Sequence, residues 1–427
     1  MTLFFSRAFL PLIALGLNGC SGDTGNPIQT QRDPRIRWVY EVGTPIYFGS
    51  PALSADGLTM YVGTSSSTLS AVPRQQALVA LDVGTGALKW SFSLGLAEVR
   101  SSPAVAPDGS VTVLVEERNA TGGFVATEVV RVSSTGAQLW RRALGIAGSA
   151  VDIGFSAPAI GADGSVYVAT DSLYALNANG TVRWTRFFTG EELRASPVIG
   201  GDGTIYFAAH DIPLTAMHPD SGRVLWTRAL GAQDHVFASP AIGSDGTLYV
   251  ATDACVLYAV SSSGDDLWNF DAGTSGSTCA MRSSPAIGAD GTIYLGTVDR
   301  NPRPVLFAIR PTGVLRWTYN PSGLPVDVAP TSFDIYSSPV IGSDGVVYFG
   351  HEFSRVYAVD GQTGGERWVV RTTSGILWSS PALTLGGVLL ISDIAGRVYA
   401  ITTESPGLPG TSPWPRYRGG NRSAGRR

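Results

Sequence analysis

The sequence predicts an all-β fold, an eight-bladed β-propeller whose blades each hold four antiparallel strands. One observation is a unit that occurs eight times: Ser-Pro (once Ala-Pro), a few apolar residues, a turn that usually contains Asp-Gly, and an alternating apolar segment. A second is the period of 39 to 55 residues, which is typical of propeller blades. The repeated prolines are Pro51, Pro103, Pro158, Pro197, Pro240, Pro285, Pro339 and Pro381.

The copy from Ser196 to Trp226 shows the four strands of a blade. Strands are predicted over Pro197 to Gly200, Thr204 to Ala208 and about Leu214 to His218, and a fourth surrounds Trp226. Asp-Gly between apolar runs is a strong hairpin signal, because both positions accept positive φ. Calcium binding is the alternative for these aspartates, but the turns lack the further oxygen ligands that calcium needs. The pair recurs at 56–57, 108–109, 163–164, 202–203, 245–246, 290–291 and 344–345.

Seven of the copies end in a tryptophan that follows a glycine by four residues. We expect the glycine to permit the last turn of the blade and the indole to fill the space between wedge-shaped blades. These tryptophans are Trp90, Trp140, Trp184, Trp226, Trp268, Trp317 and Trp368.

The last copy, from Ser380 to Ile401, supplies only three strands and no tryptophan. The missing strand is predicted at the other end of the chain, over Arg35 to Val42, where Trp38 takes the place of the absent tryptophan. The N-terminal strand would complete the eighth blade and close the ring. Closure removes the open strand edges that invite aggregation.

The first residues are predicted to be a lipoprotein signal peptide, residues 1–19. Arg7 supplies the positive charge, and the apolar run from Ala8 to Leu17 is too short to span a bilayer. Leu-Asn-Gly-Cys at 17–20 resembles a lipobox and would make Cys20 the lipidated residue. An ordinary signal peptide cleaved nearby is the alternative. Ser21 favours sorting to the outer membrane, facing the periplasm, by resemblance to lipoproteins.

Three further regions follow the signal peptide. Residues 20–34 are predicted to be a flexible tether, 35–403 the propeller, and 404–427 a basic C-terminal tail. The tail is interpreted as a disordered end or as a contact with acidic groups or lipid headgroups.

Composition and motifs exclude several function classes. The net charge of −4 provides no basic field, so nucleic acid is not an expected partner. The four histidines are scattered, and no zinc, haem, nucleotide or Ser-hydrolase motif is present. No catalytic residue and no metal site is therefore assigned. Cys255 and Cys279 are predicted to form a disulfide. A catalytic thiol is the less favoured interpretation, because no histidine nearby in the sequence would form a Cys-His pair.

One face of the ring is predicted to carry the variable loops, namely the second-to-third-strand turns and the connections between blades. Loop variation over a constant scaffold favours binding on that face. Acidic residues at these turns predict a carboxylate-lined funnel for a cation or a basic partner, and a solvated rim is an equal alternative. Arg100, Arg194 and Arg282 would partly neutralise it. The acids are Glu116, Asp171, Asp211, Asp253, Asp299, Glu352 and Asp393.

The repeat resembles the pyrroloquinoline-quinone (PQQ) type of propeller repeat over about residues 35–403. The pattern A-x-D-x-x-x-G-x-x-x-W of quinoprotein dehydrogenases is complete twice. In that family these residues dock blades to one another, which the resemblance implies here as well. The two copies are Ala80, Asp82, Gly86 and Trp90, and Ala358, Asp360, Gly364 and Trp368.

Two functions follow from the resemblance. The architecture is similar to that of the propeller lipoproteins of the outer-membrane β-barrel assembly machinery. This implies a membrane-anchored, monomeric, non-enzymatic scaffold in the cell envelope that binds protein partners and needs no cofactor. The alternative is a quinoprotein dehydrogenase that oxidises an alcohol or sugar with PQQ and calcium.

Overall fold

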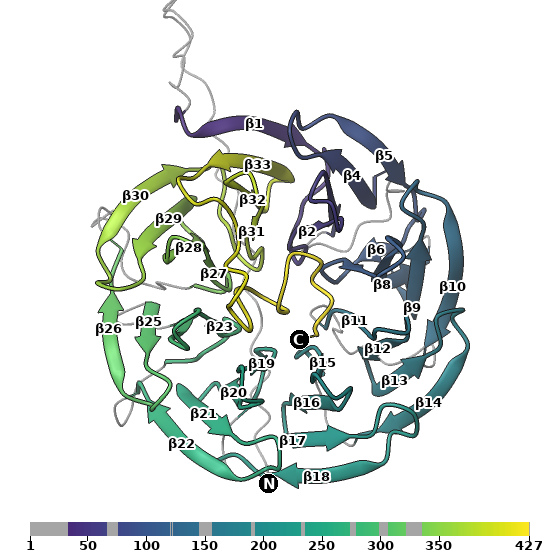
Figure 1. Cartoon of the computed structure of the whole chain (residues 1–427). Helices are drawn as coiled ribbons and strands as arrows, with labels where there is room; N and C mark the ends of the chain where they lie inside the picture. Colours follow the sequence, from purple (N-terminus) through teal and green to yellow (C-terminus); the bar gives the residue numbers. More distant parts are fainter. Residues whose placement is uncertain are drawn as a thin grey trace, which may run out of the picture. The chain divides into compact units, whose positions relative to one another are not determined.

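The eight-bladed propeller is confirmed by a computed structural model (Figure 1). The structure describes residues 33–65, 76–119, 121, 123–144, 156–188, 193–231, 235–273, 279–298, 306–321 and 335–426. The predicted signal peptide, Cys20 and Asp299 lie outside these residues. Within the described part of the chain, no helix is long and apolar enough to cross a membrane.

Each blade is a meander whose first strand lies nearest the centre of the ring and whose fourth lies at the rim (Figure 1). The first four blades are β2 (Ala52–Leu53), β3 (Thr59–Gly63), β4 (Leu78–Asp82), β5 (Leu88–Phe92); β7 (Ala104–Val105), β8 (Val111–Arg118), β9 (Phe124–Val132), β10 (Gln138–Leu144); β11 (Ala159–Ile160), β12 (Val166–Ala169), β13 (Ser172–Leu176), β14 (Val182–Phe187); and β15 (Val198–Ile199), β16 (Ile205–Ala209), β17 (Ile212–Met217), β18 (Val224–Arg228). A short strand, β6 (Glu98–Val99), adds to β8 in the second blade.

The other four blades follow the same order. They are β19 (Ala241–Ile242), β20 (Leu248–Ala251), β21 (Val256–Val260), β22 (Asp266–Asp271); β23 (Ala286–Ile287), β24 (Ile293–Gly296), β25 (Leu306–Ile309), β26 (Leu315–Tyr319); β27 (Val340–Ile341), β28 (Val346–His351), β29 (Arg355–Asp360), β30 (Glu366–Arg371); and β31 (Ala382–Leu383), β32 (Val388–Ser392), β33 (Arg397–Thr402), β1 (Ile36–Glu41).

The N-terminal strand closes the ring, as predicted. β1 pairs antiparallel with β33, so that Trp38 lies opposite Ala400 and Glu41 opposite Arg397. The Arg397 guanidinium donates to the Glu41 carboxylate at 2.9 Å. The eighth blade therefore contains strands from both ends of the propeller.

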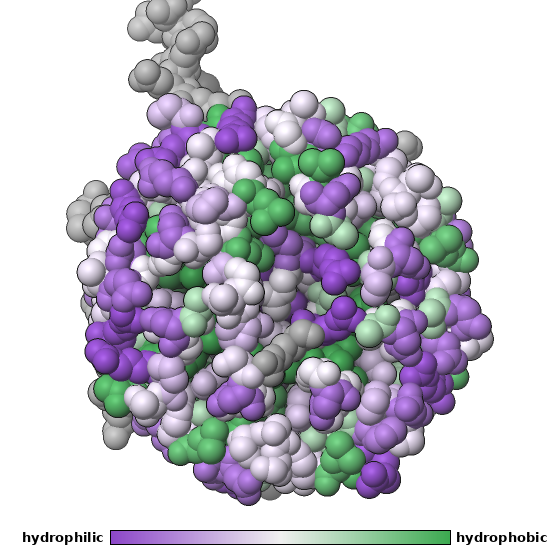
Figure 2. Space-filling model, viewed as in Figure 1, coloured by the Kyte–Doolittle hydropathy of each residue, from purple (hydrophilic) through white to green (hydrophobic). Residues whose placement is uncertain are grey.

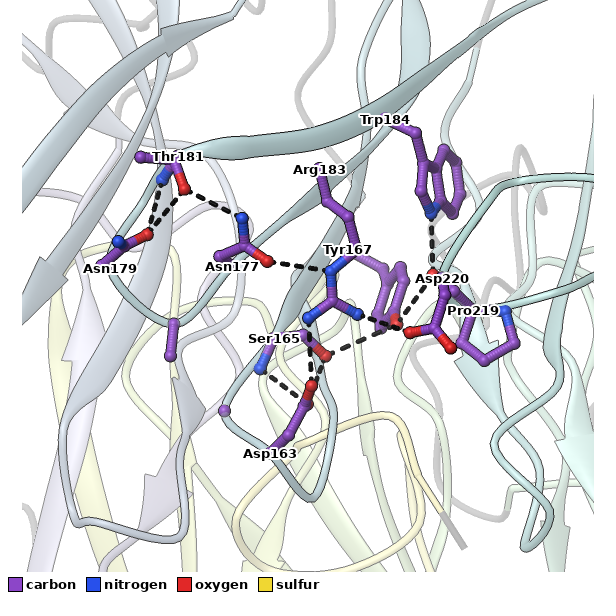
Figure 3. A network of polar contacts seen from close by, with 12 residues as sticks. Asp163, Ser165, Tyr167, Asn177, Asn179, Thr181, Arg183, Trp184, Pro219 and Asp220 are labelled. Carbon is purple, nitrogen blue, oxygen red and sulfur yellow. Dashed lines mark hydrogen bonds and ion pairs between the residues drawn. The ribbon is translucent and has the colours of Figure 1, made fainter.

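The Asp-Gly pairs form the turns between the first and second strands. In all seven, the aspartate Oδ1 accepts the backbone N–H two residues later, at 3.0–3.2 Å. This hydrogen bond stabilises the turn locally. Figure 3 shows how one such turn also joins two blades: Arg183 binds Asp163 of its own blade and Asp220 of the next, both at 3.1 Å.

Seven of the eight blade tryptophans pack on the glycine of the following blade. Trp38 covers Gly86, where a Cβ would lie 2.6 Å from the indole, and six further Trp–Gly pairs repeat the contact around the ring. Seven indole N–H groups also donate to a carbonyl of the neighbouring blade at 2.7–3.0 Å. Glycine is required here for two reasons. Its φ is positive, and the indole of the preceding blade occupies the space that a side chain would need.

The serines of the Ser-Pro motif form a hydrogen-bonded ring. The backbone N–H of each residue before the proline donates to the Oγ of its counterpart in the next blade, at 2.9–3.0 Å. Among these described positions the sequence of bonds is interrupted once, after Ser102, because Ala157 has no hydroxyl. We call the following the ring serines: Ser50, Ser102, Ser196, Ser239, Ser284, Ser338 and Ser380.

The C-terminal segment, residues 404–426, lies inside the ring and crosses its centre (Figure 1). Six N–H groups on the innermost strands donate to its carbonyl oxygens, for example Leu53 to Asn421 and Ile287 to Trp414, both at 2.8 Å. Trp414, Arg416 and Arg418 are fully buried. The segment therefore satisfies the inner strand edges that would otherwise line an open channel. In the same view as Figure 1, Figure 2 shows hydrophilic residues near the centre of the ring.

The basic charge of this segment is partly hidden in the channel. Arg416 donates to the carbonyl of Pro51 at 3.0 Å, and Arg418 donates to that of Pro158. Among the described residues neither guanidinium pairs with a carboxylate. Burial lowers the pKa of Arg416 to about 9 and that of Arg418 to about 10.

We expect Gly86→Ala to lower the free energy of unfolding by about 2–4 kcal/mol. Roughly 1 kcal/mol comes from the positive φ, and roughly 1–3 kcal/mol from the collision with Trp38. Gly57→Ala is the matched control, because Gly57 has a similar φ of 71° but nothing within 4 Å of its Cβ position. It should cost only about 1 kcal/mol. Equal losses in urea unfolding would contradict the packing of Trp38 on Gly86.

Removing one ring serine should destabilise the propeller. Ser196→Ala leaves the buried N–H of Ala157 without its acceptor, a loss of about 1–3 kcal/mol in the free energy of unfolding. Ala157→Ser should add an acceptor for Ser102 and raise stability by about 0.5–1.5 kcal/mol. The exposed Ser134→Ala serves as control. If Ser196→Ala unfolds at the same urea concentration as Ser134→Ala, the ring makes no net contribution.

Candidate functional site

A collar of arginines and aromatic residues surrounds the central opening on the face that carries the connections between blades. Every member stands two residues before a ring serine, where the chain reaches the innermost strand. Phe155 takes the corresponding position before Ala157 but lies outside the described residues. The collar residues are Phe48, Arg100, Arg194, Phe237, Arg282, Tyr336 and Trp378.

Contacts within the collar hold the side chains against one another. The Arg194 and Arg282 guanidinium groups lie over the Phe237 ring, 5.2 and 4.9 Å from its centroid. Arg100 lies 5.5 Å from the centroid of Phe48. Such cation–π contacts hold each guanidinium group against a neighbouring ring.

Tyr336 and Trp378 form the aromatic side of the collar. Their ring centroids are 4.3 Å apart, and both side chains are partly exposed. Tyr417 of the C-terminal segment lines the same opening together with five ring serines. The space between these side chains is only about 50 Å³. A site of this shape presents a shallow surface of arginine and aromatic groups, the residue types that are enriched at the energetic centres of protein interfaces.

The predicted acids occupy separate positions, and none of the described ones lines this opening. The turns that carry them join the second and third strands, which lie farther from the axis than the collar. Glu116 is buried and pairs with Arg100 at 2.9 Å and with Arg118. Asp393 is buried, accepts two backbone N–H groups at 3.0 Å, and accepts the Tyr399 hydroxyl at 2.8 Å.

Three of the remaining acids also contact neighbouring side chains. Asp171 accepts hydrogen bonds from Thr170 and Tyr174 at 2.8 and 3.1 Å. Asp253 pairs with Arg282 at 3.1 Å, and burial raises the pKa of its carboxyl although Arg282 opposes that shift. Asp211 lies beside two histidines, and Glu352 is partly buried.

Cys255 and Cys279 are joined by a disulfide with their Cα atoms 5.5 Å apart. Cys255 ends the turn between β20 and β21 with a positive φ of 63°, and Cys279 precedes the innermost strand of the next blade. The bridge thus ties the connection between two blades to a turn on the same face, close to the Asp253–Arg282 pair.

His351 lies fully buried at the end of β28. Its Nδ1 accepts the N–H of Phe353 at 3.2 Å, and its buried Nε2 has no hydrogen-bond partner among the described residues. Burial, reinforced by the nearby positive Arg355, lowers the pKa of His351 to about 3. The imidazole is therefore neutral in the folded protein.

This neutral histidine should make the protein less stable in acid. The unfolded chain takes up a proton near pH 6.5, whereas the folded chain does so only near pH 3. The stabilising contribution is complete above pH 6.5 and declines as the pH falls toward 3, by at most about 1.4 kcal/mol per pH unit. His351→Gln should remove that part of the pH dependence in urea unfolding, and the control His218→Gln should retain it. An unchanged slope in His351→Gln would contradict the assignment.

The residues at the opening do not fit PQQ held by calcium. Calcium takes roughly six to eight oxygen ligands, usually with several carboxylates. The described side chains around the opening supply arginines, aromatic rings and serine hydroxyls. The C-terminal segment fills the channel below, and the remaining space is far smaller than the ~300 Å³ of small ligand sites. We therefore derive no reaction step from this cofactor.

Comparisons with known proteins support the architecture. A family model described as outer membrane protein assembly factor BamB matches residues 33–184, 125–244 and 169–405. The crystal structure of BamB from Moraxella catarrhalis superposes with a TM-score of 0.61 at 16% identity, covering 86% of this chain and 100% of that one. That likeness shows a shared fold.

A catalytically inactive virginiamycin B lyase from Staphylococcus aureus, solved with quinupristin, gives a TM-score of 0.48 at 14% identity, covering 70% of this chain and 94% of that one. No curated protein matches the chain.

The collar was not expected from the sequence, although a signal was present. When the eight copies are aligned on the residue before proline, every position two residues earlier holds arginine or an aromatic residue. The three arginines among them were expected only to neutralise the acids.

Proposed function

The chain belongs to the family of the outer membrane protein assembly factor BamB, and from this premise we propose that it is a non-enzymatic scaffold for outer-membrane protein assembly. The collar is the observation that carries the proposal. Its arginines and aromatic rings converge from separate blades on one partly exposed surface. Such a surface suits a protein partner better than a small substrate, because it is shallow and offers hot-spot residue types.

The collar favours a partner that contributes acidic and apolar groups. Arg194 and Arg282 place guanidinium groups on this surface, while Phe237, Tyr336 and Trp378 provide apolar contact area. The basic partner first expected for an acidic funnel is less well supported, because the described acids are paired or buried away from the opening. Shape and charge together point to a loop or extended segment of a partner that enters the shallow opening.

We further propose that Cys20 carries a lipid that anchors the chain to the outer membrane, with the propeller in the periplasm. The lipobox-like residues 17–20 and the placement of the family support this location. The disulfide between Cys255 and Cys279 is consistent with an oxidising compartment. A monomer on a tether would leave the collar accessible to partners.

The test is complementation in the host bacterium after deletion of the gene. Loss of the protein should reduce the amount of folded outer-membrane β-barrel proteins, and the wild-type chain should restore it. A chain with Tyr336→Ala and Trp378→Ala should restore less, because it lacks the aromatic side of the collar. Leu385→Ala is the matched control, since Leu385 is a 77% exposed apolar residue in a first-to-second-strand turn of the opposite face.

The outcomes separate two claims. If deletion leaves the folded barrel proteins unchanged, the assembly role is wrong. If the deletion matters but the double variant restores barrel proteins as well as Leu385→Ala does, the collar is not the binding surface. Equal amounts of each variant in the envelope must be verified by immunoblotting.

A further inference from the structure

Two histidines and an aspartate converge on the collar face from adjacent parts of the ring. His210 and Asp211 form the two-residue turn between β16 and β17, in which Ala209 pairs with Ile212. Asp211 has a positive φ of 58°, a conformation that aspartate tolerates in tight turns. His235 comes from the connection between the fourth and fifth blades. The fold therefore brings together residues that are 24 positions apart in the sequence.

The three side chains point toward one another. The Asp211 carboxylate lies 3.0 Å from His210 Nδ1 and 3.5 Å from His235 Nδ1. The two imidazole rings are stacked in parallel, with centroids 3.6 Å apart. One ligand atom from each residue can be chosen so that all three lie within 4.8 Å of one another.

These separations are those of ligands around a small metal ion. Zinc binds imidazole nitrogen and carboxylate oxygen at about 2.0–2.2 Å, so two ligands in a tetrahedral shell lie roughly 3.3–3.5 Å apart. The His235–Asp211 distance of 3.5 Å lies within that range, and the His210–Asp211 distance of 3.0 Å is a hydrogen bond that a bound ion would replace. Imidazole with carboxylate is also a donor set that suits divalent zinc, copper and nickel.

The surroundings hold this cluster in place. The N–H of Asp253 donates to the carbonyl of His235 at 2.9 Å, which fixes that residue against the fifth blade. The ring of Phe237 meets the ring of His210 edge-on at 6.1 Å. His235 Nδ1 is buried and has no hydrogen-bond partner within the described residues, although it faces Asp211. An unbonded ring nitrogen aimed at a carboxylate is the arrangement that a shared metal ion would complete.

We propose that His210, Asp211 and His235 bind one divalent transition-metal ion such as zinc. Three protein ligands leave one tetrahedral position open, and the 60% exposure of the Asp211 side chain places that position toward solvent. The site lies beside Phe237 and the Asp253–Arg282 pair, at the edge of the collar. It extends beyond the scaffold role and does not depend on it.

No site for zinc was expected from the sequence, because none of the usual His and Cys ligand spacings is present. His210 stands in a turn of the fourth blade and His235 in the connection to the fifth, and Asp211 was expected in an acidic funnel. Only the stacking of neighbouring blades brings the three donors within reach of one ion.

The test is titration of the purified full-length protein, stripped of metal, with Zn²⁺ by calorimetry and with Co²⁺ by visible absorption. The wild-type protein should bind one equivalent, and Co²⁺ should give the bands of a four-coordinate nitrogen and oxygen site. His235→Ala and Asp211→Asn should each weaken this binding by at least about 10–100-fold. His218→Ala is the matched control, because His218 lies on another turn of the same blade, and it should bind like the wild type.

Thermal unfolding distinguishes loss of a ligand from loss of the fold. Zn²⁺ should raise the melting temperature of the wild-type and His218→Ala proteins, because metal binds only their folded state. It should not raise that of His235→Ala, whose melting temperature without metal should match the wild type. Absence of stoichiometric binding, or equal binding by His235→Ala and Asp211→Asn, would overturn the proposal.

Discussion

The propeller depends on a hydrogen bond that passes from blade to blade around the axis. Each donor is a backbone N–H that is fixed by the following proline, and each acceptor is a serine hydroxyl in the next blade. Seven of the eight junctions between blades carry this bond at nearly the same length, so these blades are joined in the same way. Tryptophan and glycine make the corresponding contact nearer the rim. Together these contacts fix the blades at two radii, so their relative rotation has little freedom.

This arrangement also positions the collar. In the seven blades where this position is described, the side chain two residues before the ring serine lies at the mouth of the channel, whatever the length of the preceding loop. Loop length can therefore vary while the arginines and aromatic rings remain in register. The residues of the proposed metal site are also positioned by contacts between blades, but farther from the axis. There the turn after β16 meets the connection that leads to the fifth blade.

Features that repeat within one blade could be predicted from the sequence, and those that depend on the neighbouring blade mostly could not. The Asp-Gly turns, the fourth strand around each tryptophan and the closing strand at Trp38 follow from local patterns. The third strand of the fourth blade begins at Ile212, two residues before the prediction, because His210 and Asp211 alone make the turn. The acceptor of each ring serine and the indole above each glycine belong to another blade, so spacing along the chain does not reveal them. The C-terminal segment was misleading for a related reason, since its arginines resemble a solvated basic end although Arg416 and Arg418 are buried.

The closing blade has a consequence for how the protein is made. β1 and β33 lie side by side, yet about the whole propeller separates them along the chain, so their pairing carries a large loop-closure entropy. A chain that is synthesised from its N-terminus presents β1 first and cannot give it a partner until the last blade has followed. The C-terminal segment then enters a ring that already exists. Between those events the incomplete chain carries an unpaired strand edge, the kind of surface through which partly folded chains aggregate.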